Sequence, residues 1–480
     1  MAKKKLKSNG IFFTGKASDD VTGSQYYIKF GNTQLLLECG LHQSSKNDYL
    51  EMYKINSEKF KFKPSELNFV FVGHSHIDHI GCIPRLVKEG FRGKIIATEE
   101  TVKVMKPLLF NSCAILNEEA RILSKKFGRT YTPLYSEEDV EKTLDLVLVY
   151  NDYNRIYTLN DNVSFQWLHN SHCVGAAQLQ LILKDGNTTK RILYTSDLGA
   201  LNPSNHYVNK TEIPTDFNDV VLMESTYGDS KRTTKKKRSY DKEHLRAAID
   251  TVIERKGTVI MPCFSFSRTQ EILTTLYELY HGDKDFKTPV IVDSKLSCDI
   301  SKLYNSLLRD NRLNQWKSVY SWGNVRFIED KEESNANIAN PMPKIILSSS
   351  GFCTNGRIVG YLKKYLKDSK SMIIFSGYVG DNPSYLSYRI KNYCDRSSIK
   401  VNGEMIPNRA DCITLSTFSS HANCNDLTQY GSSLNTDKLV LVHGTSEAKK
   451  NLAEKLRVAI SKKNKTFKVV EAVKGMTVRL

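Results

Sequence analysis

Two hairpin-like patterns of hydrophobic and polar positions mark the first part of the chain. Apolar residues concentrate on both sides of a Gly-Asn turn in residues 24–38, and of an Asp-Gly turn in residues 178–195. Such dipeptides between two apolar runs favour tight turns between antiparallel strands. Residues 99–127 lie between the two patterns and have an amphipathic, helix-like distribution. We therefore predict two strand-rich segments and one long helix.

In the middle of the chain, helix-like and strand-like segments alternate. Apolar residues have helical spacing in 244–253 and 268–280, and an apolar run at 257–262 lies between them. Two further short apolar runs, at 290–293 and 344–349, are typical of buried strands. This alternation predicts an α/β block with a parallel sheet. The last part of the chain returns to strands and polar loops.

A cluster of metal-seeking side chains follows the apolar run at 67–72. Residues 73–79 read Gly-His-Ser-His-Ile-Asp-His, which gives four donors: His74, His76, Asp78 and His79. Residues two apart on an extended backbone point to the same side, so one loop can present ligands to two adjacent metals. Nitrogen and carboxylate donors without thiolate suit hydrolytic zinc. The alternative, a surface loop, requires three of the chain's 11 histidines to cluster by chance.

Three further donors lie downstream, each next to the end of a predicted strand. His172 lies in a loop of small residues, Asp197 ends an apolar run beside a glycine, and His443 follows the apolar run 438–442. A single histidine is more often an ordinary core or surface residue. Because ligands at one edge of a sheet can converge, their shared placement favours a common site.

Composition and charge narrow the class of protein. Lys and Arg exceed Asp and Glu by 17 in 480 residues, which favours a polyanionic partner such as nucleic acid, although basic proteins also arise for other reasons. No apolar run approaches the roughly 18 residues that span a bilayer, and no apolar segment follows the basic N-terminus. The ten dispersed cysteines form no Cys-x-x-Cys pair. We expect a cytoplasmic protein that has no membrane partner.

The order of these residues resembles the motifs of the metallo-β-lactamase superfamily, in particular its nucleic-acid-processing β-CASP branch. The resemblance extends from residue 38 to residue 443. The matching positions are Glu38-Cys39-Gly40, His74, His76, Asp78, His79, His172, Asp197, Glu224, His421 and His443. Further likenesses lie at 262–271, 349–357 and 376–378. Glu38 departs from the family, which usually has Asp at that position.

The resemblance implies an α/β fold with two domains. A four-layer αββα metallo-β-lactamase domain would carry an inserted α/β β-CASP domain built on a parallel sheet. We expect residues 1–228 to form the first part of the metallo-β-lactamase domain and residues 229–407 to form the inserted domain. Residues 408–480 would then return to complete the first domain.

The resemblance also implies two Zn²⁺ ions per chain. His74, His76 and His172 would hold one zinc. Asp78, His79 and His443 would hold the other, and Asp197 would bridge the two. Glu38 would lie behind the ligands, where its additional methylene group can shift their orientation without removing a ligand.

Catalysis in this resemblance depends on Asp78, His421 and Glu224. His421 is the expected proton donor to the departing oxygen, and Glu224 is expected to orient it. The implied reaction is hydrolysis of RNA phosphodiester bonds, chiefly endonucleolytic, with a 5′-to-3′ exonuclease mode as the second option. In the family, a histidine at the position of His443 accompanies RNA processing.

Other functions and partners stay open at this stage. The alternatives are a DNA-processing nuclease of the same branch, a small-molecule metallo-hydrolase such as a thioesterase or lactonase, and a non-catalytic scaffold. A homodimer also stays open. We expect RNA contacts from the basic run at 231–238 and from the inserted domain, at Lys235, Lys236, Lys237, Arg268 and Arg357.

Overall fold

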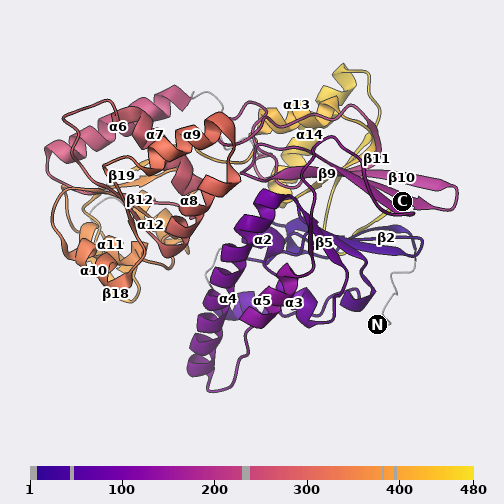
Figure 1. Ribbon diagram of the computed structural model, residues 1–480, viewed down its shortest axis with the longest axis horizontal. Helices are drawn as coiled ribbons and strands as arrows, with labels where there is room; N and C mark the ends of the chain where they lie inside the picture. Colours follow the sequence, from indigo (N-terminus) through magenta and orange to yellow (C-terminus); the bar gives the residue numbers. More distant parts are fainter. Residues whose placement is uncertain (1–7, 44–47, 230–237, 381–382, 394–396) are drawn as a thin grey trace.

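The computed structural model describes residues 8–43, 48–229, 238–380, 383–393 and 397–480. Two seven-stranded mixed sheets form one unit, and a six-stranded parallel sheet forms a second unit beside it (Figure 1). A short antiparallel hairpin, β17 (Ser398–Val401) and β18 (Glu404–Pro407), completes the described strands. The structure therefore has the mixed α/β character that the sequence predicted.

The first sheet combines strands from both ends of the chain. Its strands are, in spatial order, β22 (Thr477–Arg479), β1 (Gly10–Phe13), β2 (Tyr26–Phe30), β3 (Thr33–Leu37), β4 (Phe69–Phe71), β5 (Lys94–Ala97) and β6 (Val147–Val149). The first predicted hairpin is present as the antiparallel pair β2–β3. The remaining strands β4 to β6 pair in parallel.

The second sheet packs against the first and also recruits the end of the chain. Its strands are, in spatial order, β21 (Lys468–Glu471), β20 (Asn435–Val442), β11 (Phe217–Glu224), β10 (Thr188–Tyr194), β9 (Ala177–Asp185), β8 (Val163–His169) and β7 (Tyr157–Asn160). The second predicted hairpin is the antiparallel pair β9–β10. Because β20 to β22 join the first two sheets, the end of the chain completes the first unit.

Side chains alternate between the two faces of each sheet. Those on the facing sides form one shared apolar layer, and those on the outer side of each sheet form a further apolar layer under the helices. The inner layer contains Phe71 from β4 with Phe165 and Trp167 from β8. The outer face of the first sheet is covered by α3 (Ile83–Lys88), α4 (Glu99–Phe127) and α5 (Glu137–Leu144). The outer face of the second is covered by α13 (Cys424–Ser433) and α14 (Ser446–Lys462). This order is consistent with the expected four-layer arrangement.

Helix α4 covers residues 99–127, the range that the hydrophobic pattern predicted. Its ends have local causes. The side chain of Thr98 accepts a hydrogen bond from the backbone of Thr101, which caps the first turn. Gly128 follows with φ +64°, a left-handed conformation that ends the helix. Two shorter helices, α1 (Tyr49–Asn56) and α2 (Ile77–Ile80), complete this unit.

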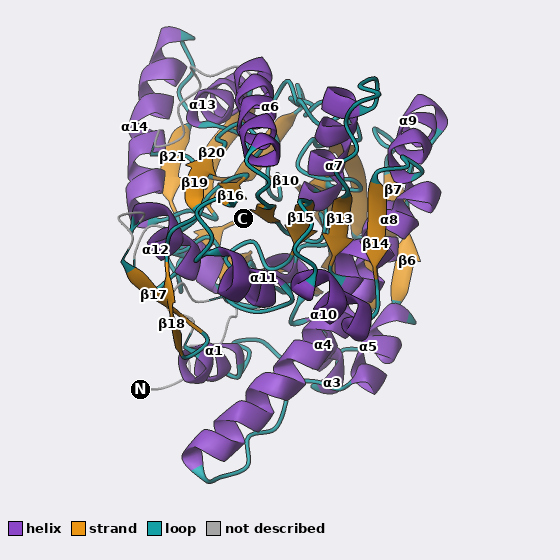
Figure 2. Cartoon of the chain, turned by 90° about the vertical axis from the view of Figure 1, so that its left-hand side faces the viewer, coloured by secondary structure: helices purple, strands orange, loops and turns teal. Residues whose placement is uncertain are grey.

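The third sheet carries helices on both faces (Figure 2). Its strands are, in spatial order, β14 (Val325–Ile328), β13 (Val290–Asp293), β15 (Ile345–Ser348), β12 (Val259–Pro262), β16 (Met372–Phe375) and β19 (Asp411–Thr414). One face packs against α6 (Arg238–Glu254), α7 (Arg268–Tyr280), α8 (Lys295–Leu307) and α9 (Asp310–Tyr320). The other packs against α11 (Ile358–Tyr365) and α12 (Leu386–Asn392), with α10 (Lys331–Ala339) beside them. Strand β19 lies beyond residue 407, where we expected the inserted unit to end.

The two units share one apolar core. Helix α4 of the first unit packs against α8 of the second. The Tyr207 hydroxyl lies 2.6 Å from Thr274 Oγ1, and its ring lies 5.7 Å from the ring of Trp316.

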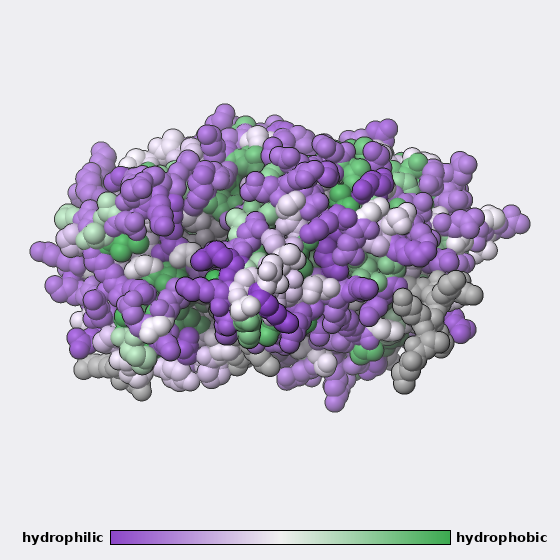
Figure 3. Space-filling view, turned by 90° about the horizontal axis from the view of Figure 1, so that it is seen from below, coloured by the Kyte–Doolittle hydropathy of each residue, from purple (hydrophilic) through white to green (hydrophobic). Residues whose placement is uncertain are grey.

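The surface of the protein is more polar than this core. The face in Figure 3 is mostly hydrophilic, with apolar residues in small separate groups.

The inner apolar layer predicts a large effect of one truncation. Trp167 is fully buried, and its ring lies 5.4 Å from that of Phe165. We expect Trp167→Ala to lower the free energy of unfolding by about 3–5 kcal/mol, because truncation leaves a cavity between the sheets. Urea unfolding followed by circular dichroism measures this.

Phe217→Ala is the matched control. Phe217 is 49% exposed at the start of β11, so its truncation should change stability by no more than about 0.5 kcal/mol. Equal effects of the two substitutions would contradict a common core between the sheets.

Candidate metal centre

The predicted ligand segment runs from the loop after β4 into α2, and it is held by the turn after β3 and by the residues before β2. The backbone N–H of Cys39 donates to the carbonyl of His79 at 2.8 Å, and that of Ser24 donates to the carbonyl of Asp78 at 2.9 Å. A Cβ atom on Gly40 would lie 1.6 Å from the Asp78 carbonyl oxygen. Only glycine lets the turn approach the loop this closely, which explains the Glu-Cys-Gly pattern locally.

The first group of donor atoms combines three imidazoles and one carboxylate. Nδ1 of His76 lies 3.0 Å from Nε2 of His74 and 3.1 Å from Nε2 of His172. Oδ2 of Asp197 lies 3.7 Å from each of those two Nε2 atoms. Ligands at about 2.0–2.1 Å from a tetrahedral zinc lie about 3.3 Å from one another. The separations are close to this value, so the group fits one cation.

The second group uses the other oxygen of the same aspartate. Nε2 of His79 lies 3.3 Å from Oδ1 of Asp197 and 3.6 Å from Oδ2 of Asp78. Nε2 of His443 lies 3.5 Å from the same oxygen of Asp78. Because Asp197 directs one oxygen to each group, the two groups share a bridging position. The structure therefore brings together all seven predicted ligands.

Strand ends explain this convergence. Asp197 follows β10, Glu224 ends β11 and His443 follows β20, and these three strands are neighbours in the second sheet. The parallel pairing of β10, β11 and β20 places their carboxyl ends at one edge. The loop after β4 meets this edge from the first sheet, where a Cβ atom on Gly73 would lie 2.6 Å from Ser196 Oγ.

The electrostatic environment favours a bound cation. Burial lowers the pKa of His76 to about 4 and holds the pKa of His74 and His172 well below the usual value, so these imidazoles are neutral donors. Nε2 of His79 and Oδ1 of Asp197 are buried 3.3 Å apart, but neither atom makes a hydrogen bond of good geometry among the described residues. Buried polar atoms without partners are costly. The donor set thus fits two hard or borderline divalent metals.

Glu38 lies behind the ligands, as expected. It is fully buried with φ 58°, and its Oε1 accepts hydrogen bonds from the Gly73 backbone at 3.0 Å and from Ser196 Oγ at 3.1 Å. The same oxygen lies 3.6 Å from Nδ1 of His79. Ser196 Oγ in turn lies 3.0 Å from Nδ1 of His74. The longer side chain therefore supports two ligand histidines at once.

His421 and Glu224 form a pair beside the first donor group. Nδ1 of His421 lies 3.1 Å from Oε1 of Glu224, and its Nε2 lies 3.9 Å from Asp197 Oδ2. Glu224 is fixed by the backbone N–H groups of Leu198, at 2.7 Å, and Thr226, at 3.1 Å. Burial opposes the charged imidazolium, but the carboxylates of Glu224, Asp197 and Asp78, with Glu224 contributing most, together outweigh burial and raise the pKa of His421.

Several supporting residues were missing from the sequence prediction. Thr226 Oγ1 lies 3.0 Å from Nδ1 of His443. The buried Asp241 on α6 accepts hydrogen bonds from the backbones of Ser416 and Thr417, at 2.8 and 2.7 Å, which anchors the segment before His421. Thr226 and Ser196 lie within two positions of motif residues, a signal that the sequence offered. Asp241 has no such signal.

Phe266 brings the second unit to the metal centre. It lies in the loop after β12, and its ring centroid is 5.6 Å from that of His76, in an edge-on arrangement. The third sheet therefore supplies part of the wall around the ligands. Phe266 lies within the likeness at 262–271, but the sequence did not indicate its contact with a ligand.

The predicted RNA-binding residues have different outcomes. Lys235, Lys236 and Lys237 lie outside the described residues. Arg268 donates to the carbonyl of Ser376 and has an 11% exposed side chain.

Arg357 has three contacts within the protein. It donates to the buried Asp293 carboxylate at 2.8 Å and to the carbonyls of Ile328 and Glu329 at 2.9 and 2.6 Å. The guanidinium groups of both arginines are engaged with the protein itself, and their contacts with RNA stay a prediction.

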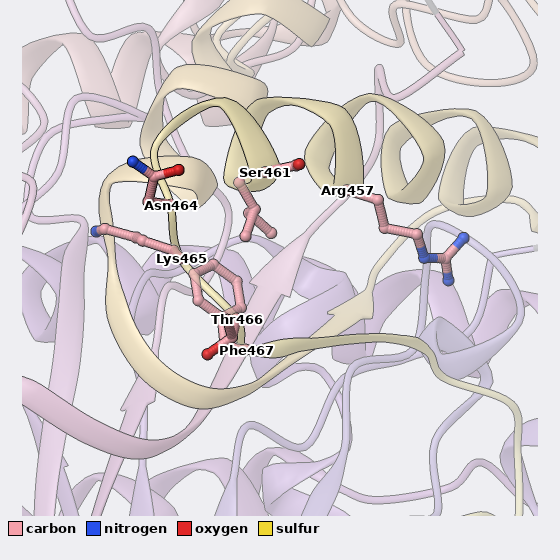
Figure 4. Close-up of a pocket in the computed structure, with 7 residues that line it drawn as sticks. Arg457, Ser461, Asn464, Lys465, Thr466 and Phe467 are labelled. Atoms are coloured by element: carbon pink, nitrogen blue, oxygen red, sulfur yellow. The ribbon is translucent and has the colours of Figure 1, made fainter.

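One surface hollow lies away from the donor groups. It has a volume of about 480 Å³ and surrounds the end of α14, lined by Arg457, Ser461, Lys465 and Phe467 (Figure 4). Lys465 Nζ donates to the Leu434 carbonyl just before β20, whereas His443 follows the other end of that strand. An eight-residue strand is about 26 Å long. The hollow is therefore not part of the metal centre.

Three family models match this chain in succession. A metallo-beta-lactamase superfamily model matches residues 18–112, and a Beta-Casp domain model matches residues 269–383. A model described as a Zn-dependent metallo-hydrolase RNA specificity domain matches residues 405–470. Among the described residues, no helix has the length and apolar character needed to cross a bilayer.

Curated relatives resemble nearly the whole chain. Ribonuclease TTHA0252 of Thermus thermophilus is 29% identical over 90% of this chain and 92% of its own length. The RNase J-like protein of Methanocaldococcus jannaschii is 28% identical over 86% of this chain and 87% of its own length. Endoribonuclease YSH1 of Eremothecium gossypii is 24% identical over 93% of this chain, which spans only 56% of that relative.

A solved structure agrees at the level of the fold. A protein of unknown function from Enterococcus faecalis V583 superposes with a TM-score of 0.54 at 12% identity, covering 98% of this chain and 100% of that one. The ordered family models, the relatives and the convergence of the motif residues lead to one conclusion. This chain belongs to the β-CASP branch of the metallo-β-lactamase superfamily.

Proposed function

We propose that this protein is a zinc-dependent ribonuclease that hydrolyses RNA phosphodiester bonds, chiefly at internal positions. The observation that carries the proposal is the pair of donor groups sharing Asp197, with His421 and Glu224 beside them. Relatives named as ribonuclease and endoribonuclease support RNA as the substrate. The RNA specificity domain model over residues 405–470 supports the same substrate.

The seven donor residues would hold two zinc ions. His74, His76 and His172 would bind one, Asp78, His79 and His443 the other, and Asp197 both. Two bound zinc ions supply activation of water and stabilisation of the charge that develops on the phosphate. Asp78, counted among the catalytic residues from the sequence, acts in this proposal as a ligand of the second ion.

His421 delivers the proton to the departing oxygen. Its Nδ1 is held by Glu224, which leaves Nε2 directed toward the donor groups, 3.9 Å from Asp197 Oδ2. The raised pKa of His421 favours the protonated form that an acid requires. Glu224 acts through His421, because its own oxygens are occupied by backbone donors.

The proposal needs a single chain. All seven donors and the proton donor come from one copy, so a homodimer is not required for hydrolysis and stays a prediction. A cytoplasmic location likewise stays a prediction.

An RNA of defined end chemistry tests the function. We expect the zinc-loaded protein to cut an internally labelled, single-stranded RNA at internal positions, equally with a triphosphate, monophosphate or hydroxyl at the 5′ end. Cleavage should stop after chelation with EDTA and return with zinc, because the proposed activation of water depends on the metal. Gel electrophoresis of the products measures this.

The products also separate the modes of cleavage. Release of mononucleotides only from the 5′-monophosphate substrate would establish the exonuclease mode instead. Cleavage of a matched DNA strand but not of RNA would overturn the choice of substrate. No cleavage of either strand by zinc-loaded protein would overturn the proposal.

A single methyl group should disturb the ligand loop. In Gly40→Ala the new Cβ would overlap the Asp78 carbonyl, so the loop carrying His79 must shift. We expect zinc content to fall from about two ions per chain to one or fewer, measured by elemental analysis after dialysis. Gly282→Ala is the control, because a Cβ atom at that position meets nothing within 4 Å. Full zinc content in Gly40→Ala would show that this contact does not fix the ligands.

Two histidine substitutions should separate binding of metal from transfer of the proton. We expect His421→Ala to keep about two zinc ions and to lose about 10²–10⁴-fold in cleavage rate. His76→Ala should lose both zinc and activity. Elemental analysis and single-turnover RNA cleavage measure the two quantities. His244→Ala, at an exposed position on α6, should change neither. Equal loss of zinc in His421→Ala and His76→Ala would refute the assigned roles.

A further inference from the structure

Three aromatic side chains lie together at the carboxyl edge of the third sheet. Phe264 follows β12, Phe352 follows β15 and Tyr378 follows β16. Strand β12 lies between β15 and β16, and it pairs in parallel with both. The three loops therefore leave the same edge of the sheet, the edge at which α/β folds usually bind ligands. We call these three residues the aromatic platform.

The rings of the aromatic platform contact one another but stay accessible. The ring of Phe352 lies 5.4 Å from that of Phe264 and 6.2 Å from that of Tyr378, both in edge-to-face geometry. The ring of Tyr385 lies 5.1 Å from Phe352 and supports it. Phe264 is 49% exposed and Tyr378 is 51% exposed. The cluster thus presents large ring surfaces to solvent instead of filling a core.

Clustered exposure of this kind points to a binding surface. Single exposed apolar residues are normal, but neighbouring exposed aromatics mark sites of interaction. The backbone is also adapted to this packing, because Gly351 leaves room for the Phe264 ring, which a Cβ atom would meet at 3.3 Å. The fold gains no buried core from Phe264 and Tyr378, so stability does not account for their positions.

The aromatic platform adjoins the metal centre. Phe264 lies two residues before Phe266, whose ring contacts that of the ligand His76. Tyr378 lies two residues after Ser376, whose carbonyl accepts the Arg268 hydrogen bond. Two residues of chain span at most about 7 Å, so Phe264 lies close to the ring that contacts the ligand His76.

We propose that the aromatic platform stacks unpaired bases of an RNA strand whose neighbouring phosphate lies at the metal centre. This rests on the function proposed above. Bases stack on Phe and Tyr rings with little regard to sequence, and this is the usual way in which proteins hold single strands. The net charge of +17 complements a polyanion, while the rings supply a contact that depends on bases and not on phosphates. The aromatic platform selects unpaired RNA next to the cleavage position.

The test compares RNA with and without bases in a protein that binds but does not cleave. The protein is full-length, zinc-loaded His421→Ala. The probes are fluorescein-labelled 20-nucleotide oligoadenylate and an abasic ribose-phosphate strand of the same length. We expect the parent to prefer oligoadenylate. Adding Tyr378→Ala or Phe352→Ala should weaken its binding by about 5- to 150-fold for each base lost from a stack, with little change for the abasic strand.

Matched substitutions isolate the stacking contact. Tyr378→Phe keeps the ring and should keep the preference. Phe217→Ala removes an aromatic of equal exposure to Phe264 at the start of β11 and should change nothing. The slope of log Kd against log salt should also stay constant, because no phosphate contact is removed. Circular dichroism and zinc content identify any variant that is misfolded. If either Tyr378→Ala or Phe352→Ala is misfolded, the other variant alone tests the stacking contact.

Three outcomes overturn the inference. The first is an unchanged preference for oligoadenylate in folded Tyr378→Ala and Phe352→Ala, and the second is an equal loss of that preference in Phe217→Ala. The third is a change from dimer to monomer in the Tyr378→Ala or Phe352→Ala protein on sedimentation, which would make the aromatic platform an interface between copies of the chain. Cleavage by the wild-type protein is scored separately. Base-dependent binding without any cleavage by wild type would support the aromatic platform and refute the proposed hydrolysis, so the two failures are distinguishable.

Discussion

The buried carboxylate of Asp197 is the interaction on which this structure depends. Nitrogens of five imidazoles lie 3.3 to 3.9 Å from its oxygens: those of His74, His79, His172, His421 and His443. Burial alone would raise the pKa of Asp197, but the surrounding histidines, His443 and His79 first, hold it well below the usual range. A buried charge needs opposite charge facing it, and the donor atoms around Asp197 fit that requirement for a bound cation.

The order of the strands places the residues around Asp197 close together. Three neighbouring strands, β10, β11 and β20, end at one edge of the second sheet, and each ends in or before a residue of the site. The first sheet supplies the loop after β4 and the turn after β3. Glu38 joins these parts, because one of its carboxylate oxygens, Oε1, accepts hydrogen bonds from the Gly73 backbone and from Ser196 and approaches His79. The longer side chain thus reaches two donors with one oxygen, while its Oε2 is buried without a hydrogen-bond partner among the described residues.

The sequence was informative where a feature is local. The two hairpins, the extent of helix α4 and the four donors at 74–79 depend on short patterns, and the structure contains each of them. His172, Asp197 and His443 were weak signals one by one, and they were selected by their placement at strand ends and by the family resemblance. The sequence was uninformative where a contact depends on distant packing. Phe266 reaches His76 only because the third sheet is docked on the first unit, and Asp241 binds a segment about 175 residues away. Arg357 is held by Asp293, a buried partner that no motif indicates.

The docking of the two units gives the site its second half. Helix α4 and Tyr207 join both units through one apolar core, so the loop after β12 has a defined position beside the ligands. The donor groups come entirely from the first unit and would be sufficient for a small substrate. The second unit adds Phe266 at the ligands and exposed rings beyond it. A binding surface that extends beyond the reacting phosphate can contact only a substrate that extends equally far, which favours a polymer over a small molecule.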